Sequence, residues 1–114
     1  MTDLKLEDLY YVCVHSKYTD SYTDFDYEEL YLGLNNAIKA AESSIDGDEY
    51  TIAIRSAMIC DDGSFGYDGL YTDPPFVLKY QPTCEVLESP NGIFVDVYEV
   101  TDKDGNVERR AFFN

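Results

Sequence analysis

One stretch of this chain, Tyr27–Ile45, has its apolar residues at the spacing of an amphipathic helix, and no other stretch does. Side chains three or four positions apart lie on the same side of a helix, so this pattern predicts one apolar stripe that packs on a core. Asp26 and Glu29 are spaced as in a capping box at the helix start, and Gly47 is a typical stop. We therefore predict a single helix, and the remaining segments must supply the rest of the core as strands.

Six further segments are rich in aromatic and β-branched residues and are bounded by turn residues, as strands are. They are Leu9–His15, Tyr50–Cys60, Phe76–Tyr80, Thr83–Leu87, Ile93–Val100 and Val107–Phe113. The first is almost continuously apolar, which predicts a strand buried on both faces. Pro82 separates the third segment from the fourth, which indicates that at least one of them lies at a sheet edge. Asp104 and Gly105 predict a hairpin between the last two.

This order of strand, helix and then several strands predicts the α+β class. The expected architecture is one amphipathic helix packed on a mostly antiparallel four- to five-stranded sheet, in two layers. A chain of 114 residues is long enough for one core, so we expect a single domain over residues 1–114. Asp61–Pro75 holds three glycines and two prolines and is expected to form a long loop.

The formal net charge is −15, from 23 acidic and 8 basic residues. This lies well outside the range of about 2–8 in magnitude that solubility alone requires. Residues 1–78 carry 16 of the acids and 4 of the bases, whereas residues 79–114 carry 7 acids and 4 bases. Coulomb repulsion disfavours direct binding to nucleic acid or to an anionic membrane and favours a basic protein partner. A generally acidic protein, or one adapted to high salt, would have the same composition.

Tyrosines accompany the acids in two segments, one around the predicted helix start and one in the predicted loop. Carboxylates held several Å apart can imitate the phosphates of DNA, and tyrosine anchors interfaces at a low entropic cost. The candidate partner-binding residues are Tyr18, Asp20, Tyr22, Asp24, Asp26, Glu28, Glu29, Asp61, Asp62, Tyr67, Asp68, Tyr71 and Asp73. The same pattern also fits a solvated acidic face with tyrosines that cover the core, and acids near a helix start have a local role in capping it.

The last predicted hairpin contains two features that resemble sites. Oxygen-bearing side chains alternate along Asp102–Asn106 as at the start of a calcium loop, but Val107 occupies the required glycine position, so a hairpin turn fits better. Arg109 and Arg110 are neighbours in a strand and should therefore point to opposite faces. We expect them to pair with acids such as Glu99 across the hairpin rather than to form a basic patch.

The reactive side chains do not form a catalytic pattern. His15 is the single histidine, and Cys13 lies two positions before it, a strand spacing at which side chains do not normally meet in hydrogen-bonding geometry. Cys13 is expected to be buried and inert. The three cysteines, which include Cys60 and Cys84, form no metal-binding or redox motif. We expect no enzyme activity, no metal and no cofactor.

The cysteine pattern and the N-terminal sequence favour a cytoplasmic location. Three unpaired cysteines, two of them in apolar runs, suit buried free thiols in a reducing compartment. The N-terminus lacks the basic start and long apolar core of a signal peptide, and the longest apolar run, Leu9–Val14, is too short to span a bilayer.

The sequence therefore predicts a non-catalytic acidic protein that inhibits a nucleic-acid-handling protein, such as a nuclease or another DNA- or RNA-binding enzyme. Inhibition would come from a DNA-mimicking surface of carboxylates and tyrosines. In size and charge the chain is similar to small acidic inhibitors from phages, such as anti-defence proteins, and to immunity proteins that neutralise nuclease toxins. The alternative is a protein–protein interaction module read through shape and tyrosine contacts, whose acidity serves solubility.

Overall fold

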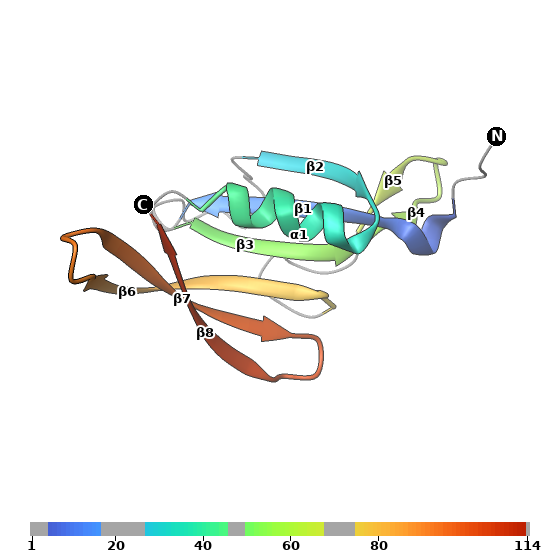
Figure 1. Cartoon of the computed structure of the whole chain (residues 1–114). Coiled ribbons are helices and arrows are strands. Elements are labelled where there is room, and N and C mark those ends of the chain that lie inside the picture. The colour runs from blue at the N-terminus through green and yellow to red at the C-terminus, as the bar shows by residue number, and fades with distance from the viewer. Residues whose placement is uncertain (1–4, 17–26, 46–49, 68–74, 114) are drawn as a thin grey trace.

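The computed structural model describes residues 5–16, 27–45, 50–67 and 75–113. Its elements are η1 (Leu6–Asp8), β1 (Leu9–Ser16), β2 (Tyr27–Leu32), α1 (Leu34–Ser43), β3 (Tyr50–Ser56), β4 (Met58–Ile59), β5 (Phe65–Gly66), β6 (Leu78–Glu88), β7 (Phe94–Asp102) and β8 (Val107–Phe113). Six strands form one sheet in the order β2-β1-β3-β6-β7-β8, and every neighbouring pair is antiparallel (Figure 1). The α+β class is confirmed, but the predicted count of four to five strands is wrong.

The first difference from the sequence prediction is the start of the helix. The segment Tyr27–Leu32 is not helical but forms β2, which pairs with β1 from Leu9 opposite Leu32 to Val14 opposite Tyr27. The predicted capping box is wrong for Glu29, which lies within this strand, while Asp26 lies outside the described residues. Tyrosines and leucines at 27, 30, 31 and 32 fit both a helical and a strand pattern, and pairing with the buried β1 decides between them.

Gly33 separates the strand from the helix. Its backbone has φ 88° and ψ 139°, a combination that L-residues with a side chain rarely adopt. The amide of Gly33 donates to the carbonyl of Asp8 at 2.6 Å, which ties this corner to the start of β1. The helix then runs from Leu34 to Ser43, and its Ala37 and Ala41 are fully buried. The predicted apolar stripe is therefore correct over the second half of the expected helix.

The predicted long strand Tyr50–Cys60 is divided into two elements. Its first part is β3, whereas Met58 and Ile59 form β4, which pairs with Phe65 and Gly66 of β5 in a separate two-stranded sheet. The prediction of one continuous strand is therefore wrong after Ser56, and part of the predicted loop is a small hairpin. Gly66 leaves room for Cys60, because a Cβ atom at position 66 would lie 2.8 Å from the Cys60 sulfur.

The strand β6 was predicted as two short strands divided by Pro82, and this division is wrong. β6 pairs with β3 only through Leu78–Tyr80, so the proline, which has no amide hydrogen, lies just beyond that ladder. Pairing with β7 continues on the other side and is interrupted between Pro82 and Val86 by an irregularity in the register. There Cys84 has a positive φ of 65°, and the Thr83 hydroxyl donates to the carbonyl of Val97 at 2.8 Å.

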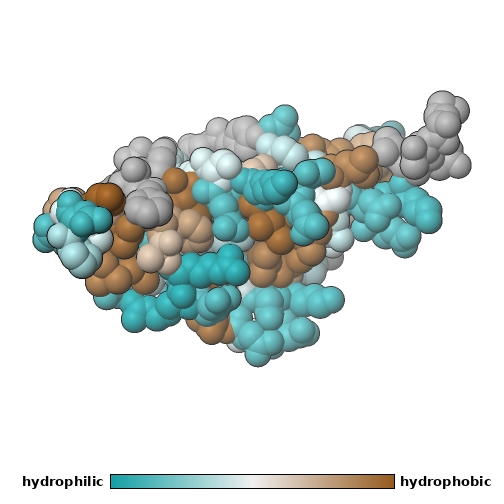
Figure 2. Space-filling view, viewed as in Figure 1, coloured by the Kyte–Doolittle hydropathy of each residue, from teal (hydrophilic) through white to brown (hydrophobic). Residues whose placement is uncertain are grey.

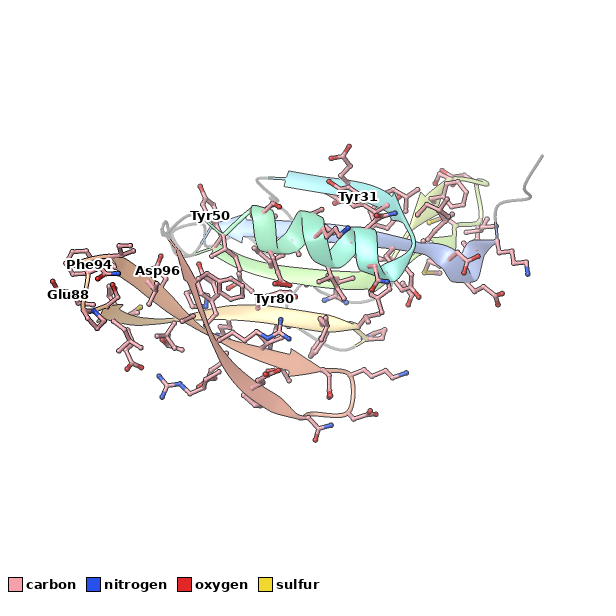
Figure 3. All side chains as sticks on the ribbon, viewed as in Figure 1. Tyr31, Tyr50, Tyr80, Glu88, Phe94 and Asp96 are labelled. Atoms are coloured by element: carbon pink, nitrogen blue, oxygen red, sulfur yellow. The ribbon has the colours of Figure 1, made fainter. Side chains whose placement is uncertain are left out.

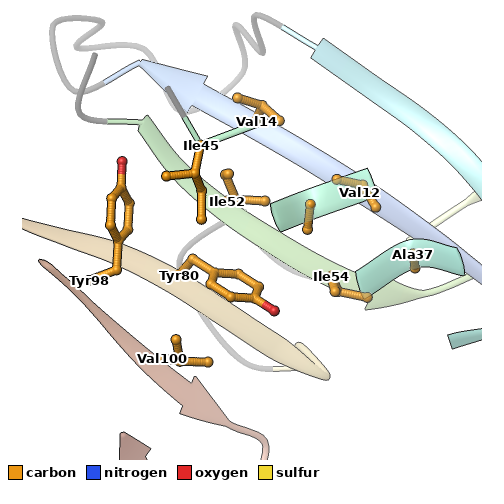
Figure 4. Packing of buried hydrophobic residues seen from close by; sticks show 10 residues of the cluster. Val12, Val14, Ala37, Ile45, Ile52, Ile54, Tyr80, Tyr98 and Val100 are labelled. Atoms are coloured by element: carbon orange, nitrogen blue, oxygen red, sulfur yellow. The ribbon is translucent and has the colours of Figure 1, made fainter. Parts of the chain in front are cut away.

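The core lies between α1 and the sheet (Figure 4). Ala37, Ala41 and Ile45 face Val12 and Val14 of β1 and Ile52 and Ile54 of β3, and the cluster continues through Tyr80, Tyr98 and Val100. Tyr98 also makes an edge-on ring contact with Phe112 at 5.8 Å between centroids. Val12 and Cys13 are both fully buried although they point to opposite faces of β1, which confirms the prediction of a strand buried on both sides.

The last two strands form the predicted hairpin. Asp102 accepts hydrogen bonds from the amides of Asp104 and Asn106 at 2.9 and 3.0 Å, so its carboxylate fixes the turn rather than opening a calcium loop. Arg109 lies opposite Glu99 in the register but forms its ion pair with Glu85 of β6. The prediction of pairing with Glu99 is therefore wrong, because the bulged β6 brings Glu85 within reach instead.

Candidate functional site

The candidate site begins at β2, an edge strand of the large sheet. Glu28 and Glu29 are neighbours in this strand, so their side chains leave from opposite faces. Both are exposed. Glu28 lies opposite Cys13 on the face away from α1, and Glu29 lies opposite Val12 on the face that carries the helix. The two acids therefore place negative charge on both sides of one sheet edge.

Tyr67 connects this edge to the segment that follows the β4–β5 hairpin. Its hydroxyl donates to a Glu28 carboxylate oxygen at 3.1 Å. Its ring makes an edge-on contact with Tyr11 at 5.3 Å and lies 5.6 Å from the guanidinium carbon of Arg55. Two predicted site residues that are 39 positions apart in the sequence, Glu28 and Tyr67, are thus brought into direct contact.

A polar cluster lies beneath Tyr67 on the face of the sheet opposite α1. Arg55 is fully buried and donates to the carbonyl of Pro75 at 2.8 Å. Burial raises the pKa of the Cys13 thiol to about 12, and a hydrogen bond with Tyr67 offsets part of this rise. Burial, followed by the neighbouring Cys13 and Glu28, also raises the pKa of Tyr67. At neutral pH the thiol is therefore protonated, and the prediction that Cys13 is buried is confirmed.

Glu29 belongs to a separate contact on the helix side of β2. It accepts a hydrogen bond from the Tyr31 hydroxyl at 3.1 Å. Residues i and i+2 of a strand lie on the same face, so this pair repeats on one side the acid–tyrosine arrangement that Glu28 and Tyr67 form on the other. Figure 3 shows Tyr31 on β2, on the same side of the sheet as α1.

Asp61 and Asp62 lie in the turn between β4 and β5 and are exposed. One Asp62 oxygen accepts bonds from the amide and the hydroxyl of Ser64 at 2.9 and 2.6 Å. These bonds hold the pKa of the Asp62 carboxyl below its usual value. Asp62 therefore has a local role as a turn cap, and its charge persists at any physiological pH.

The other predicted site residues, Tyr18, Asp20, Tyr22, Asp24, Asp26, Asp68, Tyr71 and Asp73, lie outside the described residues. Of the three cysteines, Cys13 is buried as expected, whereas Cys60 and Cys84 are exposed. Within the described ranges no group of three His, Cys, Asp or Glu side chains could hold a metal ion. No helix in this part of the chain is long and apolar enough to cross a membrane.

Sequence reasoning missed two charged residues that organise the described structure. Arg55 lies within the predicted strand Tyr50–Cys60, but nothing in its neighbourhood indicated that it would be fully buried. The Glu42 carboxylate of α1 accepts a hydrogen bond from the Tyr80 hydroxyl at 3.4 Å, and its Oε2 lies 3.6 Å from Nη1 of Arg110. Glu42 therefore links the helix to both β6 and β8. The helical spacing Ile38–Glu42 was visible in the sequence, but the position of β8 beside the helix was not.

An apolar end of the β6–β7 hairpin was also missed. Four of its side chains are about half exposed: Val86, Leu87, Ile93 and Phe94. Figure 3 shows Phe94 and Glu88 at the end of the hairpin, away from α1. The sequence predicted strands here, but it did not show that these residues extend past the part of the sheet that the helix covers.

Comparisons with known proteins identified no relative of this chain. No protein-family profile matches the chain, and no curated protein or solved structure shows significant similarity to it.

Proposed function

We propose that the protein binds a basic, nucleic-acid-binding protein, such as a nuclease, through the acidic β2 edge, and inhibits it by occupying its nucleic-acid site. The binding is non-catalytic. The surface would act as a mimic of the DNA backbone, with carboxylates in place of phosphates and tyrosines as anchoring contacts.

The contact between Glu28 and Tyr67 is the observation that supports this proposal most directly. The hydrogen bond of 3.1 Å fixes an acid from β2 against a tyrosine from a segment far away in the sequence. A fixed carboxylate loses less side-chain entropy on binding than a free one, which is a requirement for a pre-organised mimic. Glu29 and Tyr31 repeat the arrangement on the other face of the strand.

The charge distribution supports the same surface. The net charge is −15, and residues 1–78, which include β2, hold 16 of the 23 acids. A field of this sign attracts a basic partner over distances of about a Debye length, roughly 10 Å at 0.1 M salt. It also repels free nucleic acid, so the protein and the nucleic acid would compete for the partner rather than bind together.

The test is capture of a partner from a lysate of the source cell, with the protein as bait and excess duplex DNA as competitor. The proposal expects a basic nucleic-acid-binding protein that is released by DNA and by a rise in salt. The variant Glu28→Lys with Glu29→Lys should lose this capture. The matched control, Glu88→Lys with Glu99→Lys, changes the net charge equally in the C-terminal strands and should retain it, since both control residues are exposed.

Equal capture by both double variants would contradict a role for the β2 edge. Capture that resists both DNA and salt would contradict mimicry.

A second candidate function is a shape-read interaction module, and the apolar end of the β6–β7 hairpin favours it. Side chains that are about half exposed on both faces of one hairpin, such as Leu87 and Phe94, are typical of a surface that is buried in a complex. Binding by this route would survive high salt but would be lost on Leu87→Asp with Phe94→Asp, and the β2 variant would leave it unchanged.

A further inference from the structure

A groove lies where the first turn of α1 meets the end of β3, the start of β4 and residues 75–77, which lead into β6. The helix packs on β1, β2 and β3, and the groove lies at one end of this contact, beside the β7–β8 turn. Figure 2 shows apolar surface between the polar outer side of α1 and the polar β7–β8 turn. This groove is separate from the β2 edge that the proposed function uses.

The groove is large enough for a small molecule. Its volume is about 660 Å³, within the range of about 300–1,000 Å³ that ligand pockets have. Its walls are mostly apolar and come from five parts of the chain. The larger apolar side chains are Tyr10, Leu34, Met58, Phe76 and Val77. Phe76 is 6% exposed, so this wall is part of the packed structure rather than a mobile surface group.

The charge at the groove is opposite to that of the whole chain. Lys103 is the one charged side chain among the described residues that line it. Lys103 is in the β7–β8 turn, is exposed, and forms no ion pair with another residue in the described ranges. A second ammonium, that of Lys79, lies over the Phe76 ring at 5.2 Å from its centroid.

We propose that this groove binds an amphipathic monocarboxylate, a small molecule with an apolar body and one anionic end. The apolar body would lie against Leu34, Phe76 and Val77, and the carboxylate would lie at the Lys103 ammonium. A neutral ligand would gain only the apolar contacts, and the net negative charge of the protein would repel a dianion more strongly than a monoanion.

The chain contains no tryptophan, which allows a reporter to be placed in the groove. Met58→Trp puts an indole on the groove wall, where Met58 is 40% exposed, and Ile59→Trp is the matched control on the next residue, which does not line the groove. Octanoate titrated into the millimolar range should change the emission of the first variant and leave that of the second unchanged.

Two series separate the apolar and the ionic contributions. Hexanoate is two methylene groups shorter than octanoate, and each buried methylene strengthens binding about fourfold. Hexanoate should therefore bind about fifteenfold more weakly. In the Met58→Trp background, Lys103→Met should weaken octanoate binding by up to about fivefold, the range for one exposed ion pair, and leave 1-octanol binding unchanged. Lys39→Met, on the exposed side of α1, removes the same charge and should have no effect.

The absence of any octanoate response, in a variant whose circular dichroism shows the native fold, would overturn the proposal. Equal binding of octanoate and 1-octanol, with no effect of Lys103→Met, would overturn the assignment of an anionic ligand.

Discussion

Replacing Gly33 by alanine is expected to destabilise the protein through the backbone alone. An added Cβ would meet Nδ2 of Asn36 at 3.8 Å, an ordinary van der Waals distance, so no atom has to move. The conformation at φ 88° and ψ 139° is nevertheless unfavourable for any residue that has a Cβ, by about 1–3 kcal/mol. Alanine also restricts the unfolded chain, which returns about 0.4–1 kcal/mol.

The net expectation for Gly33→Ala is a loss of about 1–2 kcal/mol in the free energy of unfolding. For a chain of this length such a loss lowers Tm by roughly 5–10 °C. Urea unfolding followed by circular dichroism measures the free energy, and a thermal scan measures Tm. Gly33→Asn should be equally harmful, because asparagine tolerates a positive φ mainly at ψ of about 30–60°, far from the value here.

Two results would refute this reasoning. Unchanged stability of Gly33→Ala would mean that the corner between β2 and α1 is not needed, and a gain in ellipticity at 222 nm would mean that the helix extends back through Tyr27–Leu32. Gly66→Ala is an informative comparison, since there the cost is steric. Adding Cys60→Ala should rescue Gly66→Ala by removing the sulfur at 2.8 Å, whereas Asn36→Ala should not rescue Gly33→Ala.

Four further predictions follow from the described contacts. At pH 8 a thiol reagent should label the two exposed cysteines of the native protein quickly and Cys13 only after unfolding, because its pKa is raised to about 12. Because the pKa of this thiol is higher in the folded protein than in the unfolded chain, the unfolded chain loses the proton first as the pH rises. The urea concentration at the unfolding midpoint should therefore decrease as the pH is raised from about 9 to 12. Tyr67→Phe should cost about 1 kcal/mol, and a double-mutant cycle with Glu28→Gln should show that the two residues are coupled. The pKa of the Asp102 carboxyl is lowered in the folded protein, so the hydrogen bonds that it accepts stabilise the turn fully above its ordinary pKa. They are lost as the pH falls through the lowered pKa. The NMR chemical shift of the Asn106 amide in an acid titration would report this loss.

The elements that the sequence predicted well are those whose signals are local. Alternating residues and the Asp104-Gly105 turn defined β7 and β8 because a hairpin needs only its own two strands and its turn. The apolar run of β1 was equally clear. The presence of Pro82 led to the wrong division of β6 into two strands. The missing amide hydrogen of proline matters only where a neighbouring strand needs it as a donor, and the pairing of β6 with β3 ends at Tyr80, before the proline.

The elements that were mispredicted depended on distant partners. Tyr27–Leu32 carries acids and apolar residues in an order that suits a helix start, and only its pairing with β1 makes it a strand. The candidate site shows the same limit. Acidity and tyrosine content located the segments that hold Glu28 and Tyr67, but no local rule could show that the two side chains meet or that Arg55 is buried behind them.

The short ladder between β3 and β6 divides the sheet into two groups of strands. Within the sheet ladder, only three residue pairs, Ile52–Ile54 with Leu78–Tyr80, join the two groups, whereas β7 pairs with β8 over seven positions. The strands β6, β7 and β8 are joined by two short turns and need few long-range contacts, so we expect them to form early in folding. In native-state hydrogen exchange they should open together as one cooperative unit, with the ladder at Tyr80 as its boundary.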